Sequence, residues 1–261
     1  MPGRPYILAE TNWKAVKETD YEVAILPWGA TEAHNYHLPY ATDVYEADYI
    51  AAESARLAWE KGATVIALPA VPFGVNTGQL DIKLCINMNP STQAAVLRDV
   101  VDSLSYHPIR KLVLLNSHGG NDFKQMIREL QPEYPEILIC QVNWYQILPQ
   151  EDFFENRDDH AGEAETSILL HLHPDFVLPL AEAGDGSQNH FQLEALRKRW
   201  AWTPREWTKA SNDTGVGNPE KASAEKGQRF LAALTEKISA FLVELAECDP
   251  DNIYEGNKLR R

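Results

Sequence analysis

The chain has 261 residues, of which 44% are hydrophobic and 24% charged, and its formal net charge is −14. This composition is ordinary for a globular protein, and the length suits a single α/β domain over residues 1–261. The acidic balance disfavours nucleic acid, which needs clustered Lys and Arg. No apolar run is long enough to span a bilayer, and the first residues lack a signal-peptide stretch, so we expect no membrane partner.

The cysteines indicate the cellular compartment of the protein. Cys85, Cys140 and Cys248 are odd in number, lie far apart and form no CxxC pair. This argues against a disulfide framework and against a thiolate zinc site. It fits a reducing environment, so we expect a cytoplasmic protein.

Apolar runs alternate with amphipathic segments along the chain. In chain order, we expect a strand over 23–27, a helix over 43–61, a strand over 63–68, a helix over 91–106, a strand over 111–116, a helix over 123–130, a strand over 137–142, and helices over 162–171 and 222–248. Gly62 suits the end of the first helix, and Ser91 is the predicted N-cap of the second. Residues 184–220 are expected to be irregular. Continuous apolar strands between helices predict an α/β fold with a mostly parallel sheet covered on both faces.

Three short clusters hold most of the residues that bind metals or move protons. They are Glu32, His34 and Asp43; residues 117–121, with His118, Gly119, Gly120 and Asn121; and residues 160–166, with His160, Glu163 and Glu165. Two of the clusters directly follow a predicted strand. Ligands of open α/β sheets bind beyond the carboxyl ends of the strands, so these side chains should converge there. The clusters therefore predict a metal-dependent hydrolase.

Each of these residues also has a simpler structural interpretation. Asp43 could be an N-cap, and His34 and His37 could be surface histidines. Gly119 and Gly120 could form a tight turn between a strand and a helix. Glu163 and Glu165 lie in a first helical turn, where carboxylates offset the helix dipole. These interpretations do not explain why three clusters share one edge of the sheet.

Four motifs together resemble the creatininase (creatinine amidohydrolase) family. They are residues 26–39 with Thr42 and Asp43, residues 116–121, residues 160–167, and residues 214–219 with 222–227. The resemblance covers most of the chain in the expected order. It implies a three-layer α/β/α sandwich, a metal-dependent amidohydrolase site and a homohexamer.

The resemblance also implies roles for individual residues. Glu32, His34, Asp43 and His118 match metal ligands, and Asp43 can bridge two ions. His160 matches the proton-transferring histidine, and Glu165 matches a carboxylate that is a further ligand or supports one. Carboxylate and imidazole ligands suit zinc, which we expect first, or manganese or iron, with one or two ions per subunit.

Three departures from the family pattern are visible. Creatininases carry a Glu two residues after the histidine of the second motif, where this chain has Gly120, so one expected ligand is missing or replaced. Their usual Gly after the first-motif histidine is Asn35 here. Residues 80–90 replace a middle stretch that often contains a His and Phe-Pro-Gly-Thr. Creatinine is therefore an unfavourable candidate substrate, and residues 80–90 are candidates for the substrate pocket or an oligomer contact.

The predicted reaction is hydrolysis of a C–N bond in a small, non-peptide and possibly cyclic amide. A metal-bound hydroxide attacks the carbonyl carbon, and His160 protonates the leaving nitrogen. Backbone amides at Gly119 and Gly120 are candidates for holding the oxyanion, and Asn121 is a further candidate for contact with the substrate or the oxyanion. The alternatives are a formamide deformylase or a peptide-trimming maturase of the same family, a non-catalytic metal-binding protein, and an iron protein that handles oxygen.

Three tryptophans lie close together in the irregular segment. Trp200, Trp202 and Trp207 could pack into the chain's own core or anchor a contact between subunits, where Trp is enriched. With the family resemblance, they lead us to expect a homo-oligomer.

Overall fold

A computed structural model of the chain describes residues 3–156 and 159–255. Within these ranges, four parallel strands form one sheet in the order β2-β1-β3-β4. They are β1 (Val23–Trp28), β2 (Val65–Ala67), β3 (Lys111–Asn116) and β4 (Leu138–Asn143). The parallel sheet between helices confirms the predicted fold class.

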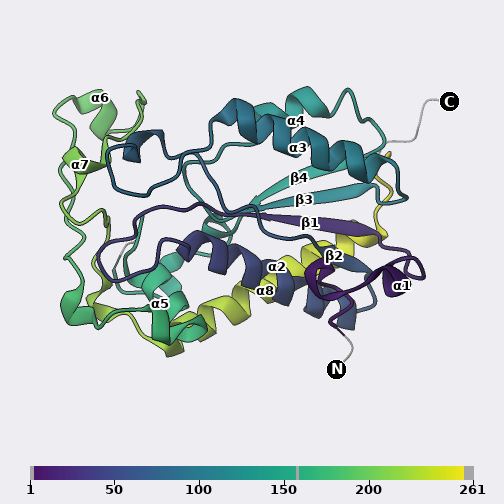
Figure 1. Cartoon of the computed structure of the whole chain (residues 1–261), viewed down its shortest axis with the longest axis horizontal. Helices are drawn as coiled ribbons and strands as arrows, with labels where there is room; N and C mark the ends of the chain where they lie inside the picture. The colour runs from purple at the N-terminus through teal and green to yellow at the C-terminus, as the bar shows by residue number, and fades with distance from the viewer. Residues whose placement is uncertain (1–2, 157–158, 256–261) are drawn as a thin grey trace.

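Helices cover both faces of the sheet (Figure 1). The described helices are α1 (Trp13–Val16), α2 (Thr42–Glu60), α3 (Pro90–Ser105), α4 (Lys124–Leu130), α5 (Glu163–Leu172), α6 (Glu194–Arg197), α7 (Trp207–Ala210) and α8 (Ala224–Glu247). Short 3-10 turns join them, including η2 (Thr77–Gln79) and η6 (Leu180–Glu182). Helices α2, α5 and α8 form one outer layer, and α3 and α4 form the other.

The alternation of side chains along β1 explains the three layers. All six residues of β1 are buried. Val23 and Ile25 pack in the core that α2, α5 and α8 share with the sheet. Ala24, Leu26 and Trp28 point the other way and pack in the core under α3 and α4. A strand covered on both faces has no solvated side, which is why its sequence is continuously apolar.

Helix boundaries follow the local sequence, with one correction. Gly62 has φ 95°, a left-handed conformation that suits the predicted end of α2. The expected N-cap at Ser91 is wrong, because α3 begins at Pro90 and Asn89 occupies the N-cap position. Proline is favoured at the first helical position because its missing N–H would have no helical partner there.

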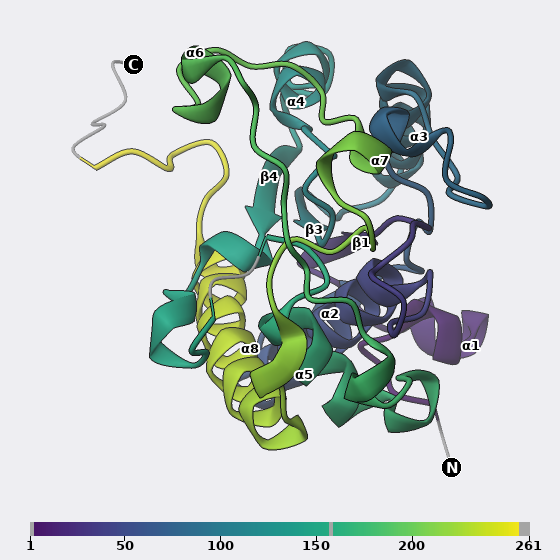
Figure 2. The same ribbon diagram turned by 90° about the vertical axis from the view of Figure 1, so that its left-hand side faces the viewer.

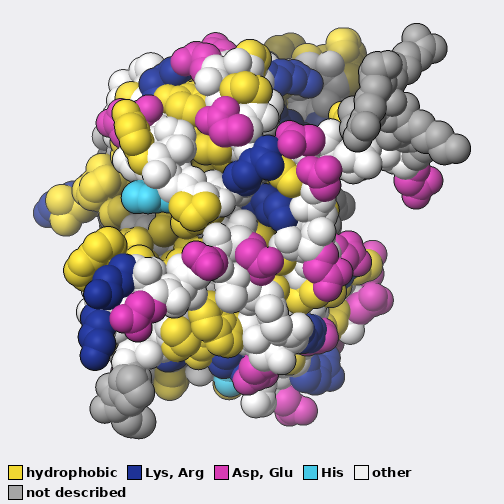
Figure 3. Space-filling model, turned by 90° about the vertical axis from the view of Figure 1, so that its right-hand side faces the viewer, with side chains coloured by type: hydrophobic (Ala, Val, Ile, Leu, Met, Phe, Trp, Pro, Cys, Tyr) yellow, Lys and Arg dark blue, Asp and Glu magenta, His cyan; other side chains and the backbone are white. Residues whose placement is uncertain are grey.

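The carboxyl ends of the strands meet at one end of the molecule. The chain between α5 and α8, which carries α6 and α7, lies across this end (Figure 2). At the opposite end, acidic and basic side chains are interspersed with hydrophobic ones (Figure 3). Among residues 3–156 and 159–255, no helix is both long enough and apolar enough to cross a bilayer.

Candidate metal centre

The three predicted clusters converge at the carboxyl end of the sheet. Glu32 and His34 follow β1, and His118 follows β3. Asp43 lies in the first turn of α2, while His160 and Glu165 flank the start of α5. Five of these six side chains are buried and Glu165 is half-buried. Residues more than 100 positions apart thus form one site.

Asp43 joins the two histidines that come from different strand ends. Its Oδ1 lies 3.0 Å from His34 Nε2, and its Oδ2 lies 3.0 Å from His118 Nδ1. The N-cap position of α2 is Ala41, so the interpretation of Asp43 as an N-cap is wrong. The buried carboxylate points one oxygen to each histidine, which is the arrangement a bridging ligand requires.

Two sets of ligand atoms share Asp43. Glu32, Asp43 and His118 form one set, in which Glu32 Oε1 lies 2.8 Å from His118 Nδ1. His34, Asp43 and Glu165 form the other, in which Glu165 Oε2 lies 4.0 Å from His34 Nε2. Glu165 therefore supplies the third side chain of the second set, and this set does not need a carboxylate at position 120.

The charges of this cluster fit a divalent cation. Burial opposes ionisation of Glu32 and Asp43, but the neighbouring histidines outweigh burial and lower the pKa of both carboxyls. Burial likewise opposes charge on the histidines, yet Asp43 raises the pKa of His34 to about 10, and Glu32 and Asp43 raise that of His118. Without a metal, protons on two histidines compensate the buried carboxylates. Buried charges need such partners, and imidazole and carboxylate donors suit zinc, manganese or iron.

Metal affinity should therefore rise with pH. A metal must displace the protons on His34 and His118, whose raised pKa values keep them charged across neutral pH in the metal-free protein. We expect affinity to increase about tenfold per pH unit for each proton displaced between about pH 6.5 and pH 9. Calorimetric titration in two buffers of different ionisation enthalpy measures the protons released. Equal affinities at pH 6.5 and pH 8.5 would contradict this.

The same pairing has a consequence for the stability of the metal-free protein. The folded-state pKa of His34, about 10, lies above its ordinary value of 6.5. The pairing with Asp43 therefore contributes stability that is fully present below about pH 6.5 and is lost as pH rises toward about 10.

His160 lies against the cluster in a defined orientation. Its Nε2 is 2.9 Å from the carbonyl oxygen of Ala33, which fixes a proton on Nε2 and leaves Nδ1 as an acceptor. Nδ1 lies 3.9 Å from Glu32 Oε1. Burial, followed by the charge on His34, lowers the pKa of His160 to about 4. His160 is therefore neutral at pH 7 and must accept a proton before it can donate one. Glu32, His34 and His160 also form a third group that could hold a metal ion, so a ligand role and a proton-transfer role predict different metal contents for His160→Asn.

Two departures from the creatininase pattern have local explanations. Asn35 has φ 52°, a left-handed conformation that glycine adopts freely and asparagine tolerates. Its side-chain oxygen accepts a hydrogen bond from Gly184 N at 2.8 Å, and its Nδ2 donates to the Gly184 carbonyl at 3.1 Å. A Cβ atom at Gly120 would overlap the Val75 carbonyl oxygen and His118 Nε2, which are themselves 3.1 Å apart. This backbone has no room for a glutamate at position 120.

The hydrogen bonds of Asn121 are directed within its own loop and to neighbouring segments. Its N–H donates to the His118 carbonyl at 3.2 Å. Its side-chain oxygen accepts from Val75 N and Gln93 Nε2, and its Nδ2 donates to Asn116 Oδ1. These bonds leave Asn121 to fix the loop. Gly119 and Gly120 are exposed beside His118, and their oxyanion role stays a prediction.

Other polar residues near the centre have structural partners. His37 is buried rather than on the surface, and its Nε2 lies 2.8 Å from Thr166 Oγ1. Glu163 is also buried, and it accepts from the backbone of Glu155 and pairs with Lys226. Both side chains hold the start of α5, so neither is needed as a ligand.

The sequence did not place Trp207, Arg205 or Gln79 beside the site, and it offered Trp207 only a role in core packing or in a subunit contact. Trp207 packs on the His160 ring with centroids 4.6 Å apart, and the Arg205 guanidinium lies 4.5 Å from the Trp207 ring. Gln79 donates a hydrogen bond to the Glu32 carboxylate. A local motif could not reveal the contacts of Trp207 with His160 and of Gln79 with Glu32, because each joins residues that are distant along the chain.

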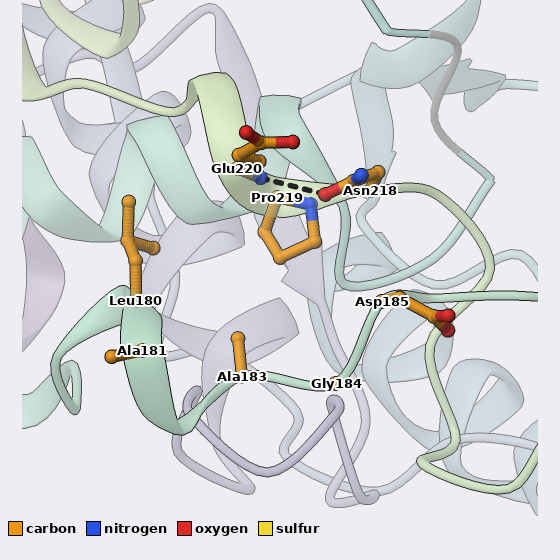
Figure 4. A pocket seen from close by; sticks show the side chains of 8 residues that line it. All are labelled: Leu180, Ala181, Ala183, Gly184, Asp185, Asn218, Pro219 and Glu220. Carbon is orange, nitrogen blue, oxygen red and sulfur yellow. Dashed lines mark hydrogen bonds between the residues drawn. The ribbon is translucent and has the colours of Figure 1, made fainter.

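A separate hollow of about 410 Å³ opens near η6 and the start of η7 (Pro219–Lys221). Figure 4 shows its lining, which consists mainly of small and apolar side chains together with Asp185, Asn218 and Glu220. None of the six clustered residues lines it. The hollow is therefore not the opening of the candidate metal centre.

A buried cluster of carboxylate and imidazole side chains at the carboxyl end of a parallel sheet is the kind of site found in metal-dependent hydrolases. The family model described as "Creatininase: Creatinine amidohydrolase" matches residues 9–242. The chain therefore belongs to the creatininase family of hydrolases, as the motifs predicted.

Similar sequences include enzymes with two kinds of substrate. The mycofactocin precursor peptide peptidase of Mycobacterium tuberculosis is 28% identical over 224 residues, covering 81% of each chain. The creatinine amidohydrolase of Pseudomonas putida is 27% identical over 267 residues, covering 91% of this chain and 96% of the relative. The family therefore includes a peptide-processing enzyme.

Solved structures agree with this fold. A provisionally assigned creatinine amidohydrolase from Bacteroides fragilis is 47% identical, with a TM-score of 0.90 over 96% of this chain and 99% of that one. A creatininase crystal structure has a TM-score of 0.76 at 22% identity, covering 94% of this chain and 99% of that one. Related creatininase structures are described as Zn–Zn and Mn types.

Proposed function

We propose that the protein is a metal-dependent amidohydrolase that cleaves a C–N bond of a small, non-peptide amide. The observation that carries the proposal is the convergence of Glu32, His34, Asp43, His118 and Glu165 into two ligand sets that share Asp43. We assign these five residues as ligands of one or two ions. The donor set suits zinc first, and also manganese or iron.

The protein's own residues have distinct tasks in this reaction. When bound, a divalent ion activates water and polarises a carbonyl oxygen. Neutral His160 uses Nδ1 to accept the proton that the attacking water releases. It then gives this proton to the leaving nitrogen, which is otherwise a poor leaving group. The Ala33 carbonyl holds the ring for both transfers at a distance of 2.9 Å. Trp207 covers the ring and limits access of bulk water.

The burial of the centre supports a small substrate. Glu32, His34, Asp43, His118 and His160 are buried, and Glu165 is half-buried. A small amide can enter such a site whole. The second candidate is trimming of a peptide, which the similarity to the mycofactocin precursor peptide peptidase favours. A peptide would have to insert one terminal residue while its remainder stays outside.

Metal analysis followed by an amide screen tests the proposal. The protein is purified without chelators, its metal content is measured, and zinc-, manganese- and iron-loaded samples are assayed on cyclic amides, linear amides, formamides and short peptides. Turnover of a small amide supports the proposal, whereas turnover of peptides alone supports the second candidate. A bound ion without any turnover supports a metal-binding protein. Inactivation in air of an iron-loaded sample alone supports an oxygen-handling protein.

We expect creatinine to be a poor substrate. Residues 80–90 and Gly120 depart from the creatininase pattern. Residues 80–90 border the site through Cys85, which bonds to Gln79 and Ala33, and Gly120 lies beside His118. The measurement is steady-state hydrolysis of creatinine by the metal-loaded protein, alongside the best amide from the screen. A creatinine turnover of roughly 1–1,000 per second, typical of enzymes, would show that these departures do not affect the pocket.

We also propose a homo-oligomer, with the hexamer implied by the family resemblance. Trp200 and Trp202 are 75% and 84% exposed, unlike Trp207, which packs on His160. We expect sedimentation at micromolar concentration to show a species several times the mass of one chain. Replacing both exposed tryptophans by Ser should shift it toward smaller species, whereas a wild-type monomer would contradict the proposal.

A further inference from the structure

One buried amide contacts the candidate metal centre without belonging to any predicted cluster. Gln79, at the end of η2, is only 1% exposed. Its Nε2 donates to Glu32 Oε2, while the other oxygen of Glu32 faces His118 Nδ1 at 2.8 Å. The two oxygens of one carboxylate thus have separate partners. Gln79 holds the oxygen that faces away from the histidine.

The orientation of the Gln79 amide is set by a thiol. Cys85 Sγ lies 3.1 Å from Gln79 Oε1 and donates to it. The same sulfur accepts from the backbone N–H of Ala33 at 3.2 Å. The thiol therefore uses its single proton on Gln79 Oε1 and a sulfur lone pair on Ala33 N–H. A reversed amide would place its oxygen against the Glu32 carboxylate, so the network favours the donor orientation.

The segment that carries this network is anchored on both sides. Ile86 N donates to the Thr31 carbonyl at 3.0 Å, next to Glu32 in the chain. On the other side, a Cβ atom at Gly78 would overlap the Arg205 carbonyl oxygen, so the segment leading to α7 packs directly on η2. Gln79 therefore cannot drift from Glu32 without disturbing these contacts.

We propose that Gln79 is a positioning residue for the metal centre: its amide, oriented by the Cys85 thiol, holds Glu32 in the rotamer that presents Oε1 beside His118. The inference rests on the metal centre of the proposed function. Groups that orient metal ligands commonly change metal affinity or activity by 10–100-fold when they are removed. A buried polar pair that only stabilised the loop would leave metal affinity unchanged.

Cobalt binding tests this without any substrate. Co²⁺ is titrated into metal-free wild type, Gln79→Met, Cys85→Ala and Cys85→Ser, following its visible absorption bands. We expect Gln79→Met to bind Co²⁺ about 10–100-fold more weakly, with altered bands. Cys85→Ala should shift both readouts in the same direction. Cys85→Ser keeps a donor, so it should remain closer to wild type.

Asn87→Ala is the matched control. Asn87 accepts a hydrogen bond from Asn76 N at 2.8 Å on the same segment, and none of its hydrogen bonds reaches the cluster. It should bind Co²⁺ as wild type does, even where its thermal unfolding temperature falls. If Gln79→Met folds and binds Co²⁺ with unchanged affinity and bands, the inference is wrong while the proposed metal centre stands. If Gln79→Met does not fold, the same result in Cys85→Ala leads to the same conclusion. Failure of the wild type to bind Co²⁺ would overturn the proposed metal centre and the inference together.

Discussion

Asp43→Ala should lose nearly all bound metal. Asp43 is the one side chain shared by both ligand sets, with its oxygens 3.0 Å from His34 and from His118. Its removal takes a ligand from each set and removes the carboxylate that joins the buried His34 and His118. We expect metal affinity to fall by more than about 100-fold, beyond the range seen for groups that only orient ligands. Elemental analysis and metal titration after dialysis measure this, and turnover should fall with occupancy.

Two further variants make the result specific. Asp43→Asn keeps the shape of the side chain while removing its charge, so it separates loss of a ligand from a cavity in the core. Asp48→Ala removes an exposed carboxylate from the same helix and should retain the metal. Full metal content in Asp43→Ala would show that Asp43 does not bridge the centre.

His160→Asn should keep its metal and lose most of its activity. The five proposed ligands form two sets without His160. His160 can transfer a proton because it is held neutral by burial and has Nε2 fixed by the Ala33 carbonyl. Removing a general acid–base group typically costs about 10²–10⁴-fold in rate. Metal content and kcat on the amide found by the screen are measured on the same sample.

The pH profile adds a readout that a structural role would not change. The metal is kept saturating at every pH, because protonation of His34 and His118 opposes metal binding. Under these conditions the wild-type rate should fall on the acidic side, where His160 becomes protonated and can no longer accept a proton. His160→Asn should lose that limb. His107→Asn changes an exposed histidine and should behave as wild type does. Loss of metal in His160→Asn would instead make His160 a ligand in the group with Glu32 and His34.

The layout of the fold could be predicted because it depends on local patterns. The run from Val23 to Trp28 is apolar throughout, and in the structure it is buried on both faces. Apolar runs of strand length between amphipathic helices leave few alternatives to a covered parallel sheet. The boundary at Ser91 failed, because proline's preference for the first helical turn outweighed the capping tendency of serine.

The convergence of the candidate site residues was also predictable from the sequence, while the contacts among them were not. Three clusters at strand ends and the creatininase motifs identified Glu32, His34, Asp43, His118, His160 and Glu165, and the structure brings them together. The resemblance did not decide whether another residue replaces the ligand that is missing at Gly120. In the structure, the Val75 carbonyl and the His118 ring leave no room for a side chain at position 120, and Glu165 lies beside His34. Which oxygen faces which nitrogen depends on the angle between α2, α5 and the sheet.

By itself the sequence determined the parallel α/β architecture, the creatininase family and the set of candidate ligands, because each follows from residue types at short spacing. Only the tertiary structure decided that Asn121 fixes a loop, that Trp207 covers His160, and that Gln79 and Cys85 hold Glu32. The contacts of Gln79 with Glu32 and of Trp207 with His160 each join residues 47 positions apart. The shorter-range bonds of Cys85 with Gln79 and of Asn121 with Asn116 depend on which way each side chain is turned. Hydrogen bonds are directional, so such choices are settled only when the packed layers fix where each side chain points.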